Sequence, residues 1–349
     1  MINRKEYSQL VLITLGLLGL FLLLAYLLKS AMEVMLLIFA GILFAIFIRG
    51  LSGFLFSRLK IIPEQLRIVI TLLLLISAFA AFVIFLAPQL AEQGQKLVKE
   101  LPAAVENIRE KIGSLNWLKD LLQSGDDADP LAAAGEVTGK FFGVFATGFG
   151  GLTGMFIILF IGLYLCFTPE TYLTGMLRLL PRNWRERGNE VFQALDHILG
   201  RWIISRFIGM LVVTLFTFLG LLYFDVPMPL GLAVLAGLLT FIPNIGPVIA
   251  AIPAVLLGYM QSSTTGLYVI LLYVLIQVVE SYLITPLIQQ RGVSLPPVIT
   301  LTSQILLASL FGFLGLLLAT PLAAAALVLV KMLYLEEVFH EQIDIEGVE

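Results

Sequence analysis

The chain has 349 residues, of which 59% are hydrophobic and 13% are charged, and its formal net charge is −3. Soluble domains carry about 25% charged residues, so this composition excludes a water-soluble fold and predicts an integral membrane protein whose main partner is the lipid bilayer. The sequence has no basic stripe, which argues against a nucleic-acid partner, and the single cysteine, Cys166, excludes a disulfide framework or a multi-cysteine metal site.

Eight stretches of the sequence are apolar over roughly the 20 residues that a membrane-spanning helix needs. In chain order they are Leu10–Leu28, Val34–Ile48, Ile68–Ala87, Phe141–Phe167, Phe207–Phe224, Leu230–Met260, Leu267–Thr285 and Val298–Val330. We therefore predict an all-α, polytopic integral membrane protein with about eight hydrophobic spans. Proline and glycine break some of these helices, and a broken segment is either a crossing or a re-entrant hairpin that returns to the side from which it entered.

The pattern divides the chain into five regions. They are N-terminal transmembrane helices at 1–87, an extracytoplasmic amphipathic helical arm and loop at 88–140, a transmembrane helix plus a cytoplasmic interfacial helix at 141–206, a transport core with broken helices at 207–335, and an acidic C-terminal tail at 336–349. The arm is either a solvated connection or an element that forms oligomers or binds a partner. Gly150 and Gly154, at GxxxG spacing in the fourth span, predict close helix packing.

Lysine and arginine fall mainly in alternate loops. With the N-terminus inside, the internal segments hold most of the basic residues, whereas the short outer loops hold only Lys29 and Arg291. Cytoplasmic loops of membrane proteins are enriched in these residues, so the pattern predicts a cytoplasmic N-terminus. If the segment 230–260 is re-entrant, every later loop changes side and the C-terminus faces outward.

The sixth stretch is too apolar for a soluble loop and too rich in proline for one unbroken helix. Pro243, Pro247 and Pro253 remove three backbone donors, and in hydrocarbon the freed carbonyls are tolerated only beside other protein or a water-filled cavity. Gly246 and Asn244 lie within this break. The amide of Asn244 is suited either to bind substrate or to cap the helix that follows, and the sequence leaves both roles open.

Glu280 is the only charged residue between Asp225 and Arg291. An ionisable group within a membrane span costs a few kcal/mol to insert, so it is expected to face a cavity or a partner. Its neighbours at three- and four-residue spacing share its helix face, just before a Thr-Pro pair interrupts the helix. The predicted path residues of this segment are Gln277, Glu280, Ser281, Thr285 and Pro286. The alternative is a structural role, with Glu280 near the interface or paired with Arg291.

The last stretch has a polar start and a second break. Gln304 belongs to a polar cluster near its beginning and is predicted to join the path. The motif from Phe311 to Pro321 is similar to that from Phe241 to Pro253, with a glycine-to-proline spacing that differs by one residue. Two broken segments in comparable positions point to a transport site between structural repeats.

The sequence gives little support for enzymatic chemistry. It contains no His-Glu-x-x-His metal helix, no nucleophile elbow and no P-loop. We therefore predict a protein that is not an enzyme, that uses no cofactor or metal, and that draws on an ion gradient for any uphill transport.

Three motifs, FIPNIGPVIAAIPA from residue 241, ESYLITPLI from residue 280 and FGFLGLLLATPLA from residue 311, together resemble the AI-2E family of bacterial permeases, also described as PerM-like. The resemblance covers nearly the whole chain. The positions that match the family signature are Pro243, Asn244, Gly246, Pro247, Pro253, Glu280, Pro286, Gly315 and Pro321.

This resemblance implies an inner-membrane transporter that forms a homo-oligomer. The family is named for export of the quorum-sensing signal autoinducer-2, and some of its members are described as sodium/proton antiporters. At 294–297 the sequence Ser-Leu-Pro-Pro stands where histidine-proline is common in relatives, so a proton-handling role for such a histidine does not carry over.

The resulting functional prediction is a secondary transporter or exporter of a small polar metabolite, with an autoinducer-2-like signal as the favoured cargo. Two alternatives from other classes remain. One is a sodium or other cation/proton antiporter, and the other is a non-transporting membrane scaffold that recruits partners through 88–140.

Overall fold

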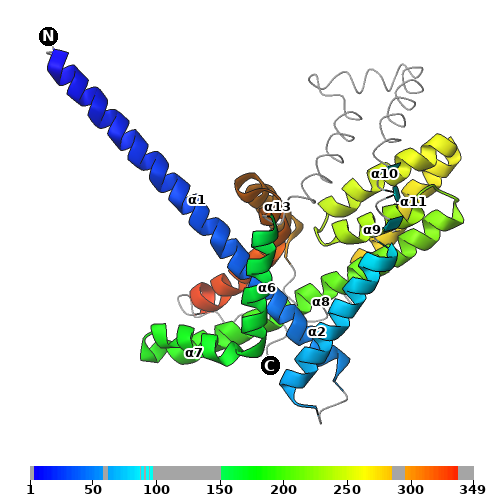
Figure 1. Ribbon diagram of the computed structural model, residues 1–349, viewed down its shortest axis with the longest axis horizontal. Coiled ribbons are helices and arrows are strands. Elements are labelled where there is room, and N and C mark those ends of the chain that lie inside the picture. Colours follow the sequence, from blue (N-terminus) through cyan, green and yellow to red (C-terminus); the bar gives the residue numbers. More distant parts are fainter. Residues whose placement is uncertain are drawn as a thin grey trace.

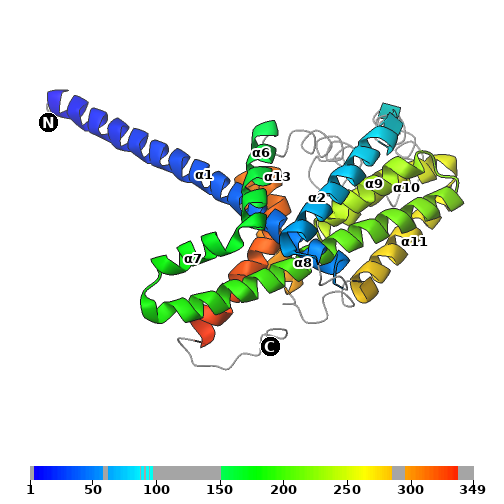
Figure 2. The same ribbon diagram turned by 60° about the horizontal axis from the view of Figure 1, so that its bottom comes forward.

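The fold is built entirely from helices in the part of the chain that the structure describes. The computed structural model describes residues 4–57, 62–86, 151–284 and 295–336, together with short pieces between 88 and 96. Within these ranges every regular element is a helix and none is a strand, so the predicted all-α class is confirmed. Figures 1 and 2 show a bundle from which the N-terminal half of the first helix projects.

Helix α1 (Arg4–Leu55) is one continuous helix of 52 residues. The prediction of two separate spans, Leu10–Leu28 and Val34–Ile48, is therefore wrong. The charged residues Lys29 and Glu33 between them are good helix formers, and no proline or glycine occurs from 21 to 40 to stop the helix. At a rise of 1.5 Å per residue α1 is about 78 Å long, more than twice the hydrocarbon thickness.

Because α1 is a single helix, the distribution of basic residues no longer fits the predicted orientation of the chain in the membrane. Arg4 and Lys5 lie at one end of the helix and Arg49 lies near the other, whereas the predicted orientation required two crossings between them. The cytoplasmic N-terminus therefore remains a proposal.

The C-terminal half of α1 packs closely against α6 (Gly151–Phe167), and glycines make this contact possible. A Cβ at Gly162 would lie 2.5 Å from Phe44 Cδ1 and 3.0 Å from the backbone oxygen of Gly41. Of the two glycines predicted to pack, Gly154 is buried in α6, and Gly150 lies outside the described residues.

Two helices flank this pair. Helix α2 (Glu64–Ala81) follows α1 and continues as a π-helical turn, Phe82–Leu86. Helix α7 (Pro169–Leu179) is bent by 90° from α6 at a break of a single residue, Thr168. Pro169 suits this place because proline at the first helical position lacks only a donor that would have no partner there.

Helix α8 (Arg185–Tyr223) runs without interruption through the proposed region boundary at 206. The segment that was predicted to form a separate interfacial helix, within 141–206, is the first half of α8. One face of this half is apolar. Ile198, Leu199 and Trp202 on this face are buried, and its neighbours are α1 and α13. Arg187 at the start of α8 forms ion pairs with Glu190 and Glu336, which hold the C-terminal segment against this helix.

The segment Leu230–Met260 forms a helix hairpin, which we call the first hairpin. Its arms are α9 (Pro229–Thr240) and α10 (Ile245–Gln261). Leu232 shares a buried cluster with Ala254, and Ala236 shares another with Ala250. Both pairs are equidistant from Pro243, so the arms are antiparallel. The 12 residues of α9 rise only about 18 Å, too little to cross roughly 30 Å of hydrocarbon, which favours the re-entrant alternative.

Helix α11 (Ser263–Val279) returns from the first hairpin and ends in a π-helical turn, Glu280–Ile284. Ser262 caps its N-terminus by accepting a hydrogen bond from the backbone N–H of Thr265. In Figure 2, α11 runs beside α8 below the first hairpin. Gly258 and Gly266 allow α10 and α11 to approach, since a Cβ at Gly266 would lie 3.0 Å from Tyr259 Cβ.

Helix α13 (Pro297–Val330) also turns back on itself, at Gly312, where φ is 61° and ψ is −141°. Its two arms, 297–311 and 313–330, are here called the second hairpin. A Cβ at Gly315 would lie only 2.0 Å from the backbone oxygen of Leu307, which is typical of a tight reversal. The similar motifs starting at Phe241 and Phe311 therefore both form hairpin turns. A π-helical turn, Lys331–Leu335, follows the second hairpin.

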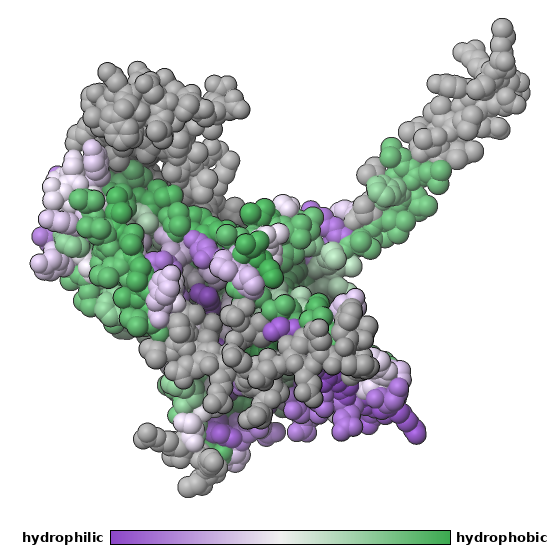
Figure 3. All heavy atoms as spheres, turned by 180° about the vertical axis from the view of Figure 1, so that it is seen from behind, coloured by the Kyte–Doolittle hydropathy of each residue, from purple (hydrophilic) through white to green (hydrophobic). Residues whose placement is uncertain are grey.

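The predicted number of spans, eight, is too high. Within the described ranges five helices are long and apolar enough to cross a membrane, or six if the bent α6–α7 pair counts as one span. One of the five is Pro297–Leu335, which we instead assign to the second hairpin because of its turn at Gly312. The excess arises because α1 was counted twice and because both hairpins were counted as crossings. Figure 3 shows a face that is apolar over much of its area, with a small hydrophilic area near its centre and a larger hydrophilic area at the lower right.

Candidate functional site

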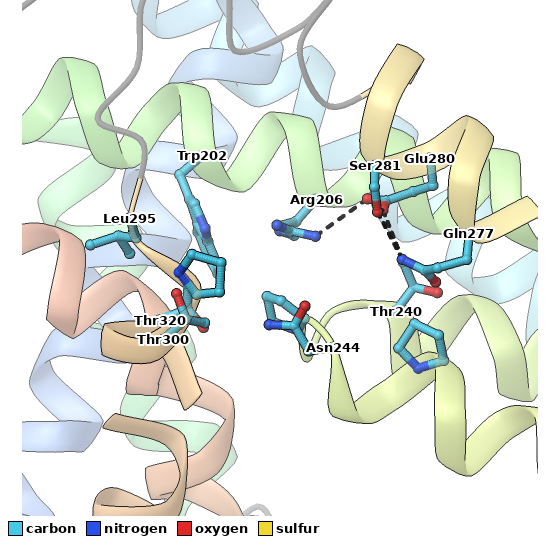
Figure 4. A pocket seen from close by; sticks show the side chains of 13 residues that line it. Trp202, Arg206, Thr240, Asn244, Gln277, Glu280, Ser281, Leu295, Thr300 and Thr320 are labelled. Atoms are coloured by element: carbon cyan, nitrogen blue, oxygen red, sulfur yellow. Dashed lines mark hydrogen bonds and ion pairs between the residues drawn. The ribbon is translucent and has the colours of Figure 1, made fainter. Parts of the chain in front are cut away.

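A polar pocket of about 320 Å³ lies where the two hairpins meet α8 and the end of α11. Its volume is at the lower end of the range for small-molecule sites, about 300–1,000 Å³. Figure 4 shows side chains from all of these elements around it. The residues that line the pocket are Trp202, Arg206, Thr240, Pro243, Asn244, Pro247, Gln277, Glu280, Ser281, Leu295, Pro297, Thr300 and Thr320.

Glu280 occupies one wall of the pocket and is only 5% exposed. Its Oε1 lies 3.4 Å from Arg206 Nη1, and its Oε2 accepts hydrogen bonds from Gln277 Nε2 at 3.3 Å and Ser281 Oγ at 3.2 Å. Gln277 Nε2 also donates to Ser281 Oγ at 3.0 Å. The structure therefore brings together the three polar residues whose helical spacing suggested a common face, with Arg206 as the charged partner.

Arg206 was missed as a site residue because it was counted among the basic residues of a cytoplasmic segment. It projects from α8, its side chain is 13% exposed, and its guanidinium lies 6.0 Å from the ring centroid of Trp202. A signal was present in the sequence, since Arg206 is the only charged residue between Arg201 and Asp225. The same reasoning that singled out Glu280 applies to it.

The turn of the first hairpin forms the opposite wall. Asn244 has a φ of 65°, its side chain is exposed, and it makes no capping hydrogen bond to α10. Figure 4 shows this side chain at the edge of the pocket. Gly246 permits the turn, because a Cβ there would lie 1.8 Å from the backbone oxygen of Leu239. The geometry leaves the amide of Asn244 available to a ligand.

Gln304 joins the two hairpins behind the pocket. It is fully buried, and its Nε2 donates a hydrogen bond of 3.0 Å to the backbone oxygen of Pro243. This oxygen is one of the carbonyls that a proline-rich break leaves without a helical partner. Gln304 therefore supports the turn from behind and does not line the pocket.

Gln304→Leu is expected to lower the free energy of unfolding by about 0.5–1.5 kcal/mol, because it removes one hydrogen bond to the Pro243 carbonyl. The carbonyl keeps the hydrogen bond from the backbone N–H of Ile245. Chemical unfolding in detergent micelles measures this change. Ser309→Ala on the same arm is the control, since the Ser309 hydroxyl is exposed and only bonds to the Leu306 oxygen of its own helix. Equal stability of Gln304→Leu and the wild type would contradict the assignment.

The other predicted path residues are less central. Thr285 and Pro286 lie outside the described residues. Gly246 is buried in the hairpin turn, and Pro253 is fully buried within α10. Residues that sequence reasoning missed are Trp202, Arg206, Thr240, Leu295, Pro297, Thr300 and Thr320. Most of these come from helix faces whose position depends on the hairpins, so local sequence patterns could not identify them.

The proposed arm at 88–140 is mostly outside the described residues, but one of its short described pieces contacts the first hairpin. Gln93 Oε1 accepts a hydrogen bond of 2.7 Å from the backbone N–H of Gly231, in the first turn of α9. A helix N-terminus has unpaired N–H groups, so this side chain stabilises the start of the hairpin. Among the residues that the structure describes, no cluster of three or more His, Cys, Asp or Glu is placed to hold a metal ion.

Comparison with known proteins assigns the chain to a family. The family model described as AI-2E family transporter matches residues 13–334. Two similar proteins are YueF of Bacillus subtilis (strain 168), provisionally described as a transport protein, and PerM of Escherichia coli (strain K12), provisionally described as a permease. The chain is 25% identical to YueF over 303 residues, which are 80% of this chain and 81% of YueF. It is 26% identical to PerM over 257 residues, which are 70% of this chain and 71% of PerM.

A further Bacillus subtilis relative, YrrI, is 30% identical over 156 residues, and this alignment spans 45% of the chain and 44% of YrrI. YrrI also carries a provisional transport-protein name. Because the family model extends over residues 13–334, nearly the whole length, the chain belongs to the AI-2E family of membrane transporters.

Proposed function

We propose that this protein is a secondary transporter of the bacterial inner membrane that moves a small polar metabolite, with an autoinducer-2-like signal as the favoured cargo. Family membership supports transport in general, and the pocket supports a small polar cargo. The observation that carries the proposal is a polar pocket between two helix hairpins in an otherwise apolar body. Broken helices at membrane depth usually line a substrate path.

The residues of the pocket have complementary roles in this proposal. Asn244 offers an amide to the cargo, and Glu280 either binds it, carries a proton or coordinates a cation. Arg206 compensates the charge of Glu280 while the pocket is empty, because an isolated buried carboxylate would be costly. Gln277 and Ser281 orient the carboxylate through their hydrogen bonds.

Glu280→Gln is expected to reduce uptake of autoinducer-2 into inverted membrane vesicles at least tenfold, because the amide neither ionises nor pairs with Arg206. Glu92→Gln is the matched control, since Glu92 is exposed and pairs only with Lys96 one helical turn away. The control variant should transport like the wild type. Unchanged uptake by Glu280→Gln would remove Glu280 from the mechanism.

A second candidate, the cation/proton antiporter, is favoured by one observation, the buried carboxylate of Glu280 with its long contact to Arg206. In proteoliposomes it would produce sodium-dependent pH changes that Glu280→Asp retains and Glu280→Gln loses. Homo-oligomer formation and a scaffold role for 88–140 also remain proposals. Deletion of 97–140 would abolish a scaffold function while substitution of Asn244 would not.

A further inference from the structure

A second cavity of about 230 Å³ adjoins the polar pocket, between α8, the first hairpin and α11. Thr240, Pro247 and Gln277 line both cavities, so the two are separated only by these side chains. We call them the polar chamber and the apolar chamber. Most of the apolar chamber is formed by aliphatic side chains, among them Ala251 of α10. One molecule can therefore reach from a charged environment into an apolar one by passing Thr240.

The apolar chamber contains two hydroxyl groups that lack partners. Thr217 on α8 is fully buried, and neither its Oγ1 nor the buried hydroxyl of Tyr273 on α11 finds a hydrogen-bond partner among the described residues. Buried hydroxyls are nearly always paired, because leaving one unpaired has a substantial energetic cost. Both residues line the chamber, but their oxygen atoms are shielded, so a small shift of the side chains would let a bound molecule or water pair with them.

The apolar chamber opens sideways toward the lipid-facing surface. Val248 and Val274 contribute to its lining and are 65% and 55% exposed. In a membrane protein, large apolar side chains with such exposure face lipid. A molecule with an apolar part can thus enter from the bilayer, where amphiphiles concentrate.

The polar chamber favours a negatively charged end group over a positively charged one. The Oε2 atom of Glu280 already accepts from Gln277 and Ser281, and its Oε1 faces Arg206. The guanidinium of Arg206 has five donors. Among the described residues it makes one long hydrogen bond, to Glu280, and its side chain lines the chamber. Arg206 and the nearby amide of Asn244 therefore have hydrogen bonds to offer an anion.

We propose that the two chambers bind one amphiphile, with an anionic end held by Arg206 and Asn244 and an apolar part in the apolar chamber. This inference rests on the proposed transport function and adds a second class of cargo to the small polar metabolite, an organic acid with an apolar chain. It also explains why Thr240 and Gln277, which lie where the two chambers meet, are polar residues beside an apolar cavity.

The binding test uses the full chain in phosphatidylcholine nanodiscs. Trp117→Phe and Trp184→Phe leave Trp202, which lines the polar chamber, as the only tryptophan, and its fluorescence reports binding. The probes are acetate, decanoate and decyltrimethylammonium. We expect a saturable response to decanoate with an apparent Kd at least tenfold below that of acetate. We expect no saturable response to the cation.

Three variants assign the chambers. Ala251→Phe fills the apolar chamber and should raise the apparent Kd of decanoate to that of acetate, whereas Ala78→Phe on the exposed face of α2 should leave it unchanged. The charge-neutral double variant Arg206→Gln/Glu280→Gln should lose the preference for the acid over the cation. Equal affinity for acetate and decanoate, or an unaltered Kd in Ala251→Phe, would overturn the inference.

Flux of radiolabelled decanoate in proteoliposomes separates this inference from the proposed function. Saturable binding without flux would overturn transport of this class of cargo and leave the binding site intact. Uptake of a short polar metabolite that is insensitive to Ala251→Phe, together with absent chain-length dependence in binding, would overturn the amphiphile site and leave the transport function intact.

Discussion

Arg206→Leu is expected to lower the free energy of unfolding by about 3–5 kcal/mol, the usual cost of removing one partner of a buried ion pair. The variant removes Arg206 from the carboxylate of Glu280, which is 5% exposed and also accepts hydrogen bonds from the uncharged donors Gln277 and Ser281. The lost attraction is modest, because 3.4 Å is long for a charge-assisted hydrogen bond. Most of the cost is instead the desolvation of a buried carboxylate that has lost the compensating charge of Arg206.

A double-mutant cycle in detergent micelles tests this explanation. Arg206→Leu/Glu280→Gln removes both charges and should recover most of the lost stability, while Glu280→Gln alone should be less stable than the double variant. If the double variant is as unstable as Arg206→Leu, packing of the arginine side chain against Trp202 would be responsible, and the ion-pair explanation would be wrong.

Gly246→Ala is expected to destabilise the protein by about 3 kcal/mol or more, the upper range for an added core methyl group. The new Cβ would lie 1.8 Å from the Leu239 oxygen and 2.5 Å from the Leu239 carbonyl carbon. These are backbone atoms that no side-chain rotation can move away. The turn of the first hairpin must open, so binding at Asn244 should be lost together with stability.

Gly175→Ala provides the control for this substitution. Gly175 lies in α7, and a Cβ there meets nothing within 4 Å. Alanine is the better helix former, so we expect a gain of about 0.5–1 kcal/mol. The comparison is made by chemical unfolding and by size-exclusion chromatography of the detergent-solubilised protein. Equal stability of the two variants would show that the turn has room that the structure does not have.

Local spacing was enough to predict one wall of the site. Gln277, Glu280 and Ser281 lie three and four residues apart, and a helix places such residues on one face regardless of the rest of the fold. The break at 243–247 was predictable for a similar reason, since proline removes donors whatever surrounds it. The interpretation of the motifs at Phe241 and Phe311 as comparable breaks also depends only on local sequence.

Properties that depend on long-range packing could not be predicted in this way. An apolar stretch such as Leu230–Met260 has the composition of a crossing, and only the packing of Ala236 against Ala250 identifies a hairpin. Arg206 is similar, because its role depends on α8 passing beside α11 so that it meets Glu280. Hydropathy also gave no boundary within α1, because Lys29 and Glu33 are compatible with a helix that simply continues.

In both hairpins the backbones of the two arms are in close contact next to the turn. A Cβ at Gly246 or Gly315 would overlap a backbone oxygen of the opposite arm, so neither arm can slide along its partner. Each hairpin is therefore expected to move as a rigid body when the site opens. Among the described residues, the hydrogen bond from Gln304 to the Pro243 oxygen is the polar link between them. We therefore expect the two hairpins to tilt against each other about this hydrogen bond during a transport cycle.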